Sequence, residues 1–289
     1  MSHAPQLMIP PEQWGVLHSR EWEPLPVRAD LEKETLEVRH AKWHRCHEAI
    51  GQLKKKLQAF SPDVIIAVGD DQHENILDDN TPPFTIYTGD EAEASTSLRY
   101  FNEPKSLNRT KYQVHSALAE SILDGLMEAG FDPAFSRKTR YEGGLGHAFA
   151  RVLKFLMPEP RCRVVPIMVN TYYPPAPSAK RCLQFGRALG ITLDRYAGRE
   201  RIVIVGSGGL SHTKIDVELD QSFIHALENN DSEYLSQMPS SVLVEGTSEI
   251  RNWIVTAAAI HRPATMVDYV PLYRTPTGVG CAMGFAYWQ

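Results

Sequence analysis

Four histidines in this sequence lie where the chain is expected to turn. His3 stands in "SHAPQL", His147 in "GGLGHAF" and His212 in "GSGGLSH", while His73 follows the aliphatic run "VIIAVG" in the stretch "GDDQHENI". An imidazole with a pKa of about 6.5 can accept or donate a proton near neutral pH, and it is also a common metal ligand. A lone histidine is more often a hydrogen-bonded surface or core residue. Each of the four therefore needs a partner before it indicates a site.

Glu249 adds a carboxylate to these histidines. It follows "GTS" at the start of the apolar stretch "EIRNWIVTAAAI", where Thr247 or Ser248 could cap a helix and the carboxylate would interact favourably with the helix dipole. Two imidazoles and one carboxylate are, however, the ligand set that holds Fe(II) while leaving positions for substrate and O₂. The sequence therefore leaves a capping role and a metal-binding role open for Glu249.

The Gly-rich turn "GSGGLSH" has an alternative function to weigh. Turns of this kind after a strand often bind phosphate through backbone N–H groups. This stretch matches neither the dinucleotide fingerprint G-x-G-x-x-G nor the P-loop, which ends in Gly-Lys-Ser or Gly-Lys-Thr. It is better suited to presenting His212 at the floor of a pocket.

Alternating strands and helices are expected to position these residues. Buried strands are predicted at "VIIAVG", "CRVVPIMVN" and "RIVIVG", and a strand-like run at "GVGCAMGFAYW". Helices are predicted over residues 31–60 (one helix or a broken pair), 112–132, 177–196, 222–238 and 246–260, and another begins after the glycines before His147. Residues 78–104 indicate a long loop with a short strand at "FTIYTG". This order predicts an α/β fold whose chemistry lies on loops at the strand ends.

Composition narrows the classes of protein. The 289 residues are 43% hydrophobic and 22% charged with a net charge of -5, which is ordinary for a globular protein. The longest basic run, Lys54-Lys55-Lys56, fits a solvated helix face better than nucleic-acid binding. No apolar segment approaches the roughly 18 to 20 residues that span a bilayer. The N-terminus lacks a signal-peptide layout, so we expect a cytoplasmic protein without nucleic-acid or membrane partners. Four scattered cysteines without a CxxC pair argue against a cysteine-based zinc site.

Six blocks, in order along nearly the whole chain, resemble the class III extradiol ring-cleavage dioxygenases. This superfamily includes protocatechuate 4,5-dioxygenase β-subunits, 2,3-dihydroxyphenylpropionate dioxygenases and 2-aminophenol dioxygenases. The blocks are "SHAPQL", "LQAFSPDVIIAVGDDQHENILDDNTPPF", "GHAFARVL", "NTYYPPAPSAKRCLQFG", "VGSGGLSH" and "GTSEIRNWIVTAAAI". The resemblance implies an α/β fold with a mixed sheet flanked by helices, formed by residues 1–289 as one catalytic domain.

The resemblance also implies a function. Such an enzyme uses non-haem Fe(II) to cleave a catechol, gallate-like or aminophenol ring at the extradiol position, and it incorporates both atoms of O₂. His3 and Glu249 fall on iron-ligand positions, His212 on the position of the active-site base, and His147 on a position with an acid role in part of the family. The implied partners are O₂, a small aromatic substrate and further subunits, in a homo-oligomer or in a hetero-oligomer.

Two departures from the family pattern affect this chemistry. An ungapped match anchored on residues 82–84 places Gln72 at the second iron-ligand histidine, whereas His73, displaced by one residue, is the better ligand for Fe(II). Successive side chains of a strand point to opposite faces, so a bulge or turn would be needed to bring His73 in. We predict that His73 is the ligand, with Gln72 as the alternative. The second departure is Gly146, which stands where the family usually has Asp before His147.

Two other functions are compatible with Gln72. A non-catalytic homologue that pairs with an active subunit would explain it, although such a scaffold has no reason to retain His147, His212 and Glu249. An altered ligand set could also hold another metal and catalyse hydrolysis or cleavage of a heterocycle. His3 lies almost at the start of the chain, so the strand that leads to this position in the family is absent or lies upstream.

The substrate pocket is expected to take its walls from two loops. These loops are residues 78–104 and 268–280. Five arginines and tyrosines are candidate substrate contacts, although each could equally be a surface or packing residue: Arg140, Tyr141, Tyr172, Tyr173 and Arg274.

Overall fold

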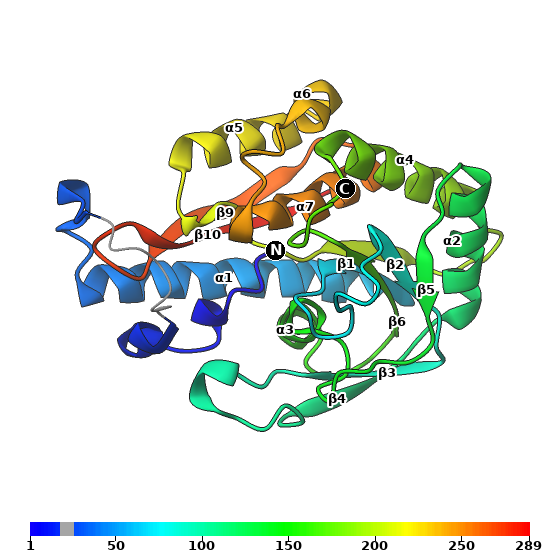
Figure 1. The fold of residues 1–289 in the computed structure, drawn as a ribbon, viewed down its shortest axis with the longest axis horizontal. Coiled ribbons are helices and arrows are strands. Elements are labelled where there is room, and N and C mark those ends of the chain that lie inside the picture. Colours follow the sequence, from blue (N-terminus) through cyan, green and yellow to red (C-terminus); the bar gives the residue numbers. More distant parts are fainter. Residues whose placement is uncertain (18–25) are drawn as a thin grey trace.

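The computed structural model of the chain describes residues 1–17 and 26–289. Within these residues, a central sheet has the strand order β5-β2-β6-β1-β7 (Figure 1). Its strands are β1 (Val64–Asp70), β2 (Phe84–Tyr87), β5 (Ala134–Ser136), β6 (Arg163–Val169) and β7 (Ile202–Gly206). β1 is parallel to both β6 and β7, whereas β2 is antiparallel to β6. The sheet is therefore mixed, and helices flank it as the sequence predicted.

The aliphatic run of β1 is buried on both faces of the sheet. Val64, Ile66 and Val68 pack into the hydrophobic cluster that includes α2 (Ser116–Glu128), α4 (Ala179–Arg195) and α7 (Ile250–Ile260). Ile65 and Ala67 pack into a second cluster with α3 (His147–Leu156). This alternation confirms the expectation that an unbroken aliphatic run forms a strand covered on both sides.

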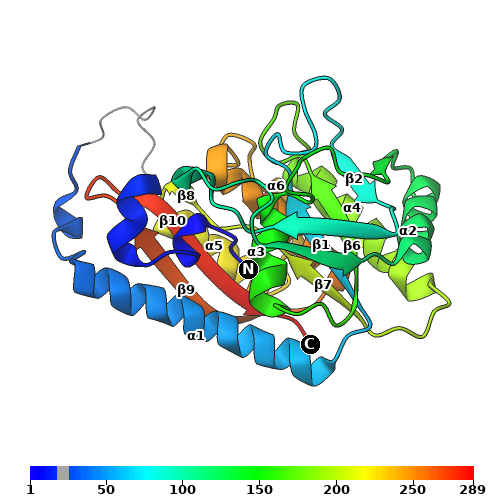
Figure 2. The same cartoon turned by 90° about the horizontal axis from the view of Figure 1, so that it is seen from below.

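A second, antiparallel sheet lies beside the first. It has the order β8-β10-β9 and consists of β8 (His212–Lys214), β9 (Thr265–Tyr273) and β10 (Val279–Tyr287). The long helix α1 (Leu36–Phe60) runs along this sheet (Figures 1 and 2). Ile50 and Leu53 of α1 share a hydrophobic cluster with Met283 of β10. The helical pattern predicted for residues 31–60 thus forms one helix.

Several strands appear where the sequence indicated loops or gave no prediction. β3 (Glu91–Ser95) and β4 (Arg109–Gln113) form a hairpin, so the expectation of a loop over residues 78–104 is wrong for 91–95. β9 likewise overturns the loop expectation for 268–273. The segment "EAEAS" has low strand propensity and is held by its pairing with β4, and Pro271 obscures the strand pattern of β9.

The remaining elements are two short helices and several 3₁₀ turns. α5 (Val217–Glu228) and α6 (Ser232–Gln237) divide the predicted helix 222–238 in two. The predicted helix 246–260 begins as a 3₁₀ turn, Glu245–Glu249, and continues as α7. Other 3₁₀ turns are Pro5–Leu7, Pro11–Leu17, Ala29–Leu31 and Arg99–Phe101.

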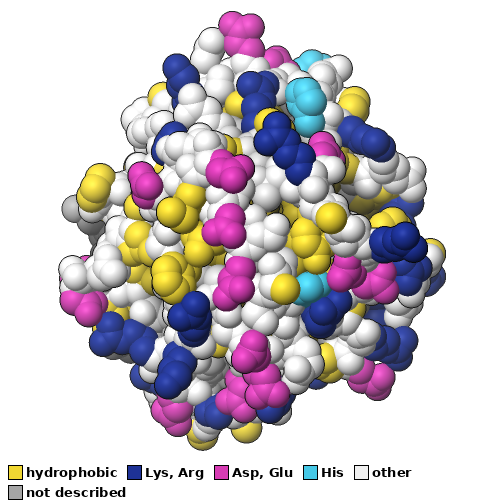
Figure 3. All heavy atoms as spheres, turned by 90° about the vertical axis from the view of Figure 1, so that its right-hand side faces the viewer, with side chains coloured by type: hydrophobic (Ala, Val, Ile, Leu, Met, Phe, Trp, Pro, Cys, Tyr) yellow, Lys and Arg dark blue, Asp and Glu magenta, His cyan; other side chains and the backbone are white. Residues whose placement is uncertain are grey.

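The molecular surface agrees with the balanced composition. On the side that lies to the right in Figure 1, basic and acidic side chains are interspersed (Figure 3). This face therefore presents no extended area of one charge. Among the residues that the structure describes, no helix is both long enough and apolar enough to cross a membrane.

Candidate metal centre and active site

The chemistry-bearing residues meet in one cavity of about 740 Å³. This volume lies within the range that small-molecule sites occupy. The cavity lies where β1 and β7 end and where β8 and the 3₁₀ turn before α7 begin. Of the residues singled out from the sequence, the following line it: His3, Gln72, Tyr141, His147, Tyr172, His212, Glu249 and Arg274.

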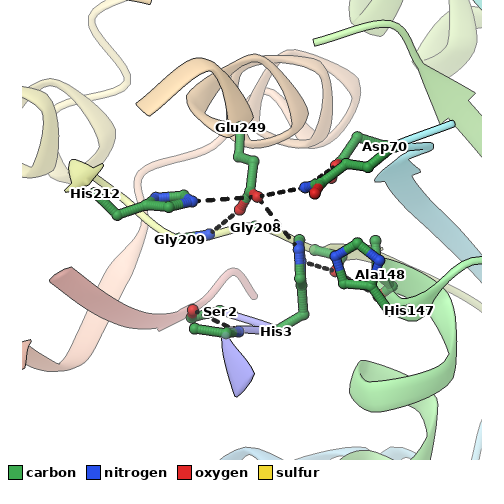
Figure 4. A network of polar contacts seen from close by, with 12 residues as sticks. Ser2, His3, Asp70, His147, Ala148, Gly208, Gly209, His212 and Glu249 are labelled. Carbon is green, nitrogen blue, oxygen red and sulfur yellow. Dashed lines mark hydrogen bonds and ion pairs between the residues drawn. The ribbon is translucent and has the colours of Figure 1, made fainter. Parts of the chain in front are cut away.

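Glu249 is the centre of the polar network (Figure 4). Its Oε1 atom lies 3.3 Å from Nε2 of His3 and 3.3 Å from Nε2 of His212. The same oxygen accepts a hydrogen bond from the hydroxyl of Tyr172, while Oε2 accepts one of 2.7 Å from the backbone N–H of Gly209. Burial raises the pKa of Glu249, but the two imidazoles outweigh burial and hold this pKa well below its ordinary value. Glu249 is therefore an ionised, buried carboxylate.

His3 is oriented by a short hydrogen-bonded chain. The Ser207 hydroxyl donates to the carbonyl oxygen of Ala148 at 2.6 Å, so its oxygen accepts from Nδ1 of His3 at 3.0 Å. Nδ1 then carries a proton, and Nε2 is the ring nitrogen that faces Glu249. The backbone places this ring, because the N–H of Gly208 donates to the carbonyl of Met1 and Arg151 donates to the carbonyl of His3.

His212 is oriented in the same sense. Its Nδ1 lies 2.9 Å from the carbonyl oxygen of Leu210, which can only accept, so Nδ1 carries a proton and Nε2 faces Glu249. Gly246 packs directly on this ring, since a Cβ atom there would lie 1.8 Å from Cδ2 of His212. The predicted role of the Gly-rich turn, to present an imidazole at the pocket floor, agrees with this position.

Asp70 supplies a carboxylate that the sequence reasoning missed. In the part of the chain that the structure describes, His3, Asp70 and Glu249 offer donor atoms that all lie within 4.8 Å of one another. Asp70 is fully buried at the end of β1, and Asn252 donates to its Oδ1 at 3.1 Å. Burial and then the nearby Glu249 raise the pKa of Asp70. The sequence feature that could have identified Asp70 is its position as an acidic residue at the C-terminal end of a predicted buried strand.

This donor set fits a divalent cation. Two carboxylates are buried side by side, and Nε2 of one imidazole lies 3.3 Å from a carboxylate oxygen. Buried charges of one sign need a compensating charge. Carboxylate oxygens and neutral imidazole nitrogen are suitable donors for Fe(II) and for Mn²⁺.

The turn after β1 separates Gln72 from His73. Nε2 of Gln72 donates to Asp70 Oδ2 at 3.1 Å and to Glu249 Oε1 at 3.3 Å. His73 adopts a φ of 57° and stacks on Tyr173 with ring centroids 3.5 Å apart, and its Nε2 lies 3.2 Å from Asp78. Gln72 therefore faces the cluster and His73 does not, so the preference for His73 as the metal ligand does not fit these positions.

His147 is the first residue of α3 and lines the cavity. Its ring meets that of His3 edge to face, with centroids 5.0 Å apart. Nδ1 lies 3.0 Å from Oε1 of Glu74. The imidazole thus has a carboxylate partner even though Gly146 precedes it.

The five candidate substrate contacts divide between the cavity and the surface. Tyr141, Tyr172 and Arg274 line the cavity. Arg140 is exposed and pairs with Asp79 at 3.3 Å, and Tyr173 packs on His73 outside the lining.

Several further cavity residues were not singled out from the sequence. Among them are Arg99, Tyr100 and Arg151. Arg151 follows His147 by four residues on α3, a spacing that puts both on one helix face and could have identified it. Arg99 and Tyr100 lie in the segment 78–104, which was expected to supply pocket walls. Among the described residues, three arginines therefore lie on the cavity walls, Arg274 included.

Fold and site together define an α/β protein with a candidate divalent-cation centre and two cavity-facing histidines beside it. The family described as the catalytic LigB subunit of aromatic ring-opening dioxygenase matches residues 31–284. The chain belongs to this family, as its six sequence blocks indicated. His3 lies outside the matched range, whereas Asp70, His147, His212 and Glu249 lie within it.

Curated relatives carry the name 2,3-dihydroxyphenylpropionate/2,3-dihydroxicinnamic acid 1,2-dioxygenase. The protein from Cupriavidus necator is 32% identical over 159 residues, which are 55% of this chain and 46% of that protein. The protein from Klebsiella pneumoniae strain 342 is 28% identical over 61% of this chain and 52% of that protein. One from Escherichia coli O139:H28 is 27% identical over 72% of this chain and 60% of its own length. Each match thus spans less than two thirds of the relative.

A crystal structure of an uncharacterized protein from Escherichia coli K12 is similar in fold. The TM-score is 0.52 at 16% sequence identity, covering 81% of this chain and 89% of that one. At this identity the likeness concerns the fold alone.

Proposed function

We propose that the chain is a non-haem Fe(II)-dependent, extradiol-type dioxygenase that opens an aromatic ring with O₂ and incorporates both oxygen atoms. The observation that carries this proposal is the convergence of a three-donor centre with the imidazoles of His147 and His212 in one cavity. Membership of a ring-opening dioxygenase family and the names of the curated relatives support it. The substrate is a catechol, a gallate-like ring or an aminophenol.

His3, Asp70 and Glu249 would hold the metal in this proposal. Gln72 would donate to both carboxylates and keep them oriented toward the cation. It occupies the position at which the family has a second imidazole ligand. When bound, Fe(II) would bring the ring oxygens and O₂ together and would stabilise the negative charge that develops on them.

Two imidazoles then move the protons. His212 accepts a proton from a ring hydroxyl at Nε2, because its Nδ1–H is already bound to the carbonyl of Leu210. His147, whose Nδ1 is held by Glu74, takes up the second acidic proton of the substrate at Nε2 and returns it during ring opening. The hydroxyl of Tyr172 donates to Oε1 of Glu249, the oxygen that both His3 and His212 face.

The ring substituent is proposed to be anionic. Arg99, Arg151 and Arg274 all line the cavity, and burial lowers the pKa of Arg151 to about 10, which leaves it charged at neutral pH. A planar guanidinium binds a carboxylate through two parallel hydrogen bonds. We therefore expect a carboxylated diol to be preferred over an unsubstituted one.

A substrate panel tests the proposed function. Purified chain is loaded with Fe(II) without oxygen, then mixed with O₂ and matched pairs such as catechol and protocatechuate. O₂ uptake with a yellow ring-opened product, at higher kcat/KM for the carboxylated member, is the expected result. A panel with no turnover after confirmed iron binding would contradict the dioxygenase proposal.

The alternative of a non-catalytic partner subunit is favoured by one observation, the amide at position 72. Stoichiometric metal bound by the chain purified alone would reject it. Assembly as a homo-oligomer or with a different subunit stays a prediction, which sedimentation of the purified chain would test.

A further inference from the structure

We infer that Glu74 is a positioning residue for His147, and that it replaces a carboxylate that would otherwise precede this histidine in the chain. Its role would be to fix the imidazole so that Nε2 faces the cavity. The inference rests on the proposed function, in which His147 transfers a proton.

The contacts between the two side chains define a single orientation. Oε1 and Oε2 of Glu74 lie 3.0 and 3.1 Å from Nδ1 of His147. The same two oxygens accept the backbone N–H of His147 at 3.0 and 3.1 Å. A carboxylate only accepts hydrogen bonds, so Nδ1 must carry the proton. Nε2 is then the nitrogen that exchanges protons with the cavity.

The turn after β1 delivers Glu74 to this position. The carboxylate of Asp71 accepts the backbone N–H groups of Glu74, Asn75 and Ile76 at 3.0, 2.9 and 3.0 Å. The side-chain amide of Asn75 donates to the carbonyl of Gly144 at 3.0 Å. The turn is therefore bound to the segment that leads into α3, and Glu74 has little freedom to move away from His147.

Gly146 completes the arrangement because it has no side chain. A Cβ atom at position 146 would lie 2.1 Å from Oε2 of Glu74, which is far closer than any non-bonded contact. Glu74 in this position and a side chain at 146 exclude each other. The two departures seen in the sequence, "DDQHEN" and Gly146, are therefore linked. The carboxylate beside His147 comes from Glu74 in the turn after β1 and not from position 146.

A second carboxylate–imidazole pair in the same turn provides a matched control. Nε2 of His73 lies 3.2 Å from Oδ1 of Asp78, but this pair is outside the cavity lining and the carboxylate is exposed. Asp78→Asn removes a carboxylate charge beside an imidazole that lies outside the cavity lining. A general effect of altering the turn would appear in both variants, whereas a positioning role would appear at Glu74 alone.

The first test compares Glu74→Ala, Glu74→Gln and Asp78→Asn in the iron-loaded enzyme. We expect Glu74→Ala to lower kcat by about 100-fold, with KM and bound metal unchanged. Glu74→Gln, whose amide oxygen can still accept from Nδ1, should keep more activity, and Asp78→Asn should match the native chain. Equal losses in all three variants, or a loss of metal with the loss of kcat, would overturn the inference.

The second test moves the carboxylate. Gly146→Asp alone should lose activity, because the new side chain displaces the Glu74 carboxylate from the position in which it holds Nδ1 of His147. Gly146→Asp combined with Glu74→Ala should recover at least tenfold in kcat over Glu74→Ala. A double variant no better than either single variant would contradict the exchange.

The third test needs no turnover. In metal-free protein with ¹⁵N-labelled histidine, two-bond N–H correlation spectra report which nitrogen of His147 is protonated, and His147→Gln identifies its signals. We expect the Nδ1–H tautomer in the native chain and a shift toward Nε2–H in Glu74→Ala. An Nε2–H tautomer in the native chain would overturn the inference. The expected tautomers without turnover on any substrate would instead contradict the proposed function and leave the positioning role intact.

Discussion

Glu249 meets four polar side chains through one carboxylate oxygen, and the neighbours of those side chains determine what each can do. Ser207 and Leu210 each hold an Nδ1–H, so the Nε2 atoms of His3 and His212 both face the same oxygen. Outer partners of this kind fix ligand orientation and tune metal affinity. At the scale of single residues, the site is set as much by its hydrogen-bond partners as by its ligands.

Ser207→Ala tests the orientation of His3. Without the hydroxyl that accepts from Nδ1, the ring can adopt the other tautomer, and we expect divalent-metal affinity to fall about 10- to 100-fold. Calorimetric titration measures this affinity. Ser248→Ala is the control, because Ser248 is equally buried beside Glu249 and its Oγ has no hydrogen-bond partner among the described residues. Equal losses in the two variants would contradict the orienting role.

Asp70→Ala and His73→Ala test the identity of the third donor. Asp70 shares the centre with His3 and Glu249, whereas His73 packs on Tyr173. We expect Asp70→Ala to lose most of the bound iron and His73→Ala to keep it, as measured by metal analysis after dialysis. Circular dichroism shows whether each variant remains folded. The reverse ranking would restore His73 as the ligand.

At the scale of elements, the sequence predicted those strands and turns that depend on the local pattern of residues. The aliphatic run of β1 and the Gly-rich turn before His212 could be predicted, because buried strands and turns have characteristic residue types. The direction of the His73 side chain could not be predicted, since it depends on the left-handed backbone conformation of His73 in the turn after β1. Asp70 was missed for a related reason. Its partner Glu249 is distant in sequence, and only the fold brings them together.

Gly246→Ala tests how the 3₁₀ turn before α7 supports the base. A methyl group at this position would overlap the ring of His212, so the ring must move away from Glu249. We expect kcat/KM to fall about 100-fold, as for loss of a positioned base, with metal still bound. Unchanged kcat/KM would show that the ring tolerates the displacement.

Gly51→Ala is the matched control for the glycine substitution. Gly51 lies inside α1, and a Cβ atom there would have nothing within 4 Å. Alanine in a helix interior is favoured over glycine by about 0.5–1 kcal/mol. We therefore expect a higher free energy of unfolding in urea and unchanged turnover. A destabilised Gly51→Ala variant would contradict the helical environment described for this residue.

At the scale of the whole molecule, the centre joins segments that are far apart along the chain. His3 comes from the N-terminal segment, Asp70 from β1 of the central sheet, and Glu249 from the turn before α7. His212 begins β8 of the second sheet. A cation bound at this point would connect the central sheet, the N-terminal segment and the turn before α7.

Metal binding should therefore stabilise the fold. A ligand that binds only the folded state at 100 times its Kd contributes about 2.7 kcal/mol. We expect Fe(II) or Mn²⁺ under anaerobic conditions to raise the melting temperature, and a chelator to reverse the rise. Asp70→Ala should abolish the dependence on metal. A melting temperature that is independent of metal in the native chain would contradict a centre at this position.

The most direct test of the central claim is the fate of labelled oxygen. The iron-loaded chain is given a carboxylated catechol under ¹⁸O₂, and the ring-opened product is analysed by mass spectrometry with O₂ uptake recorded in parallel. A dioxygenase predicts one O₂ consumed per ring opened and two ¹⁸O atoms in each product, before exchange with water. A product with one ¹⁸O atom or none, or iron-loaded protein that consumes no O₂ with any ring in the panel, would contradict the account.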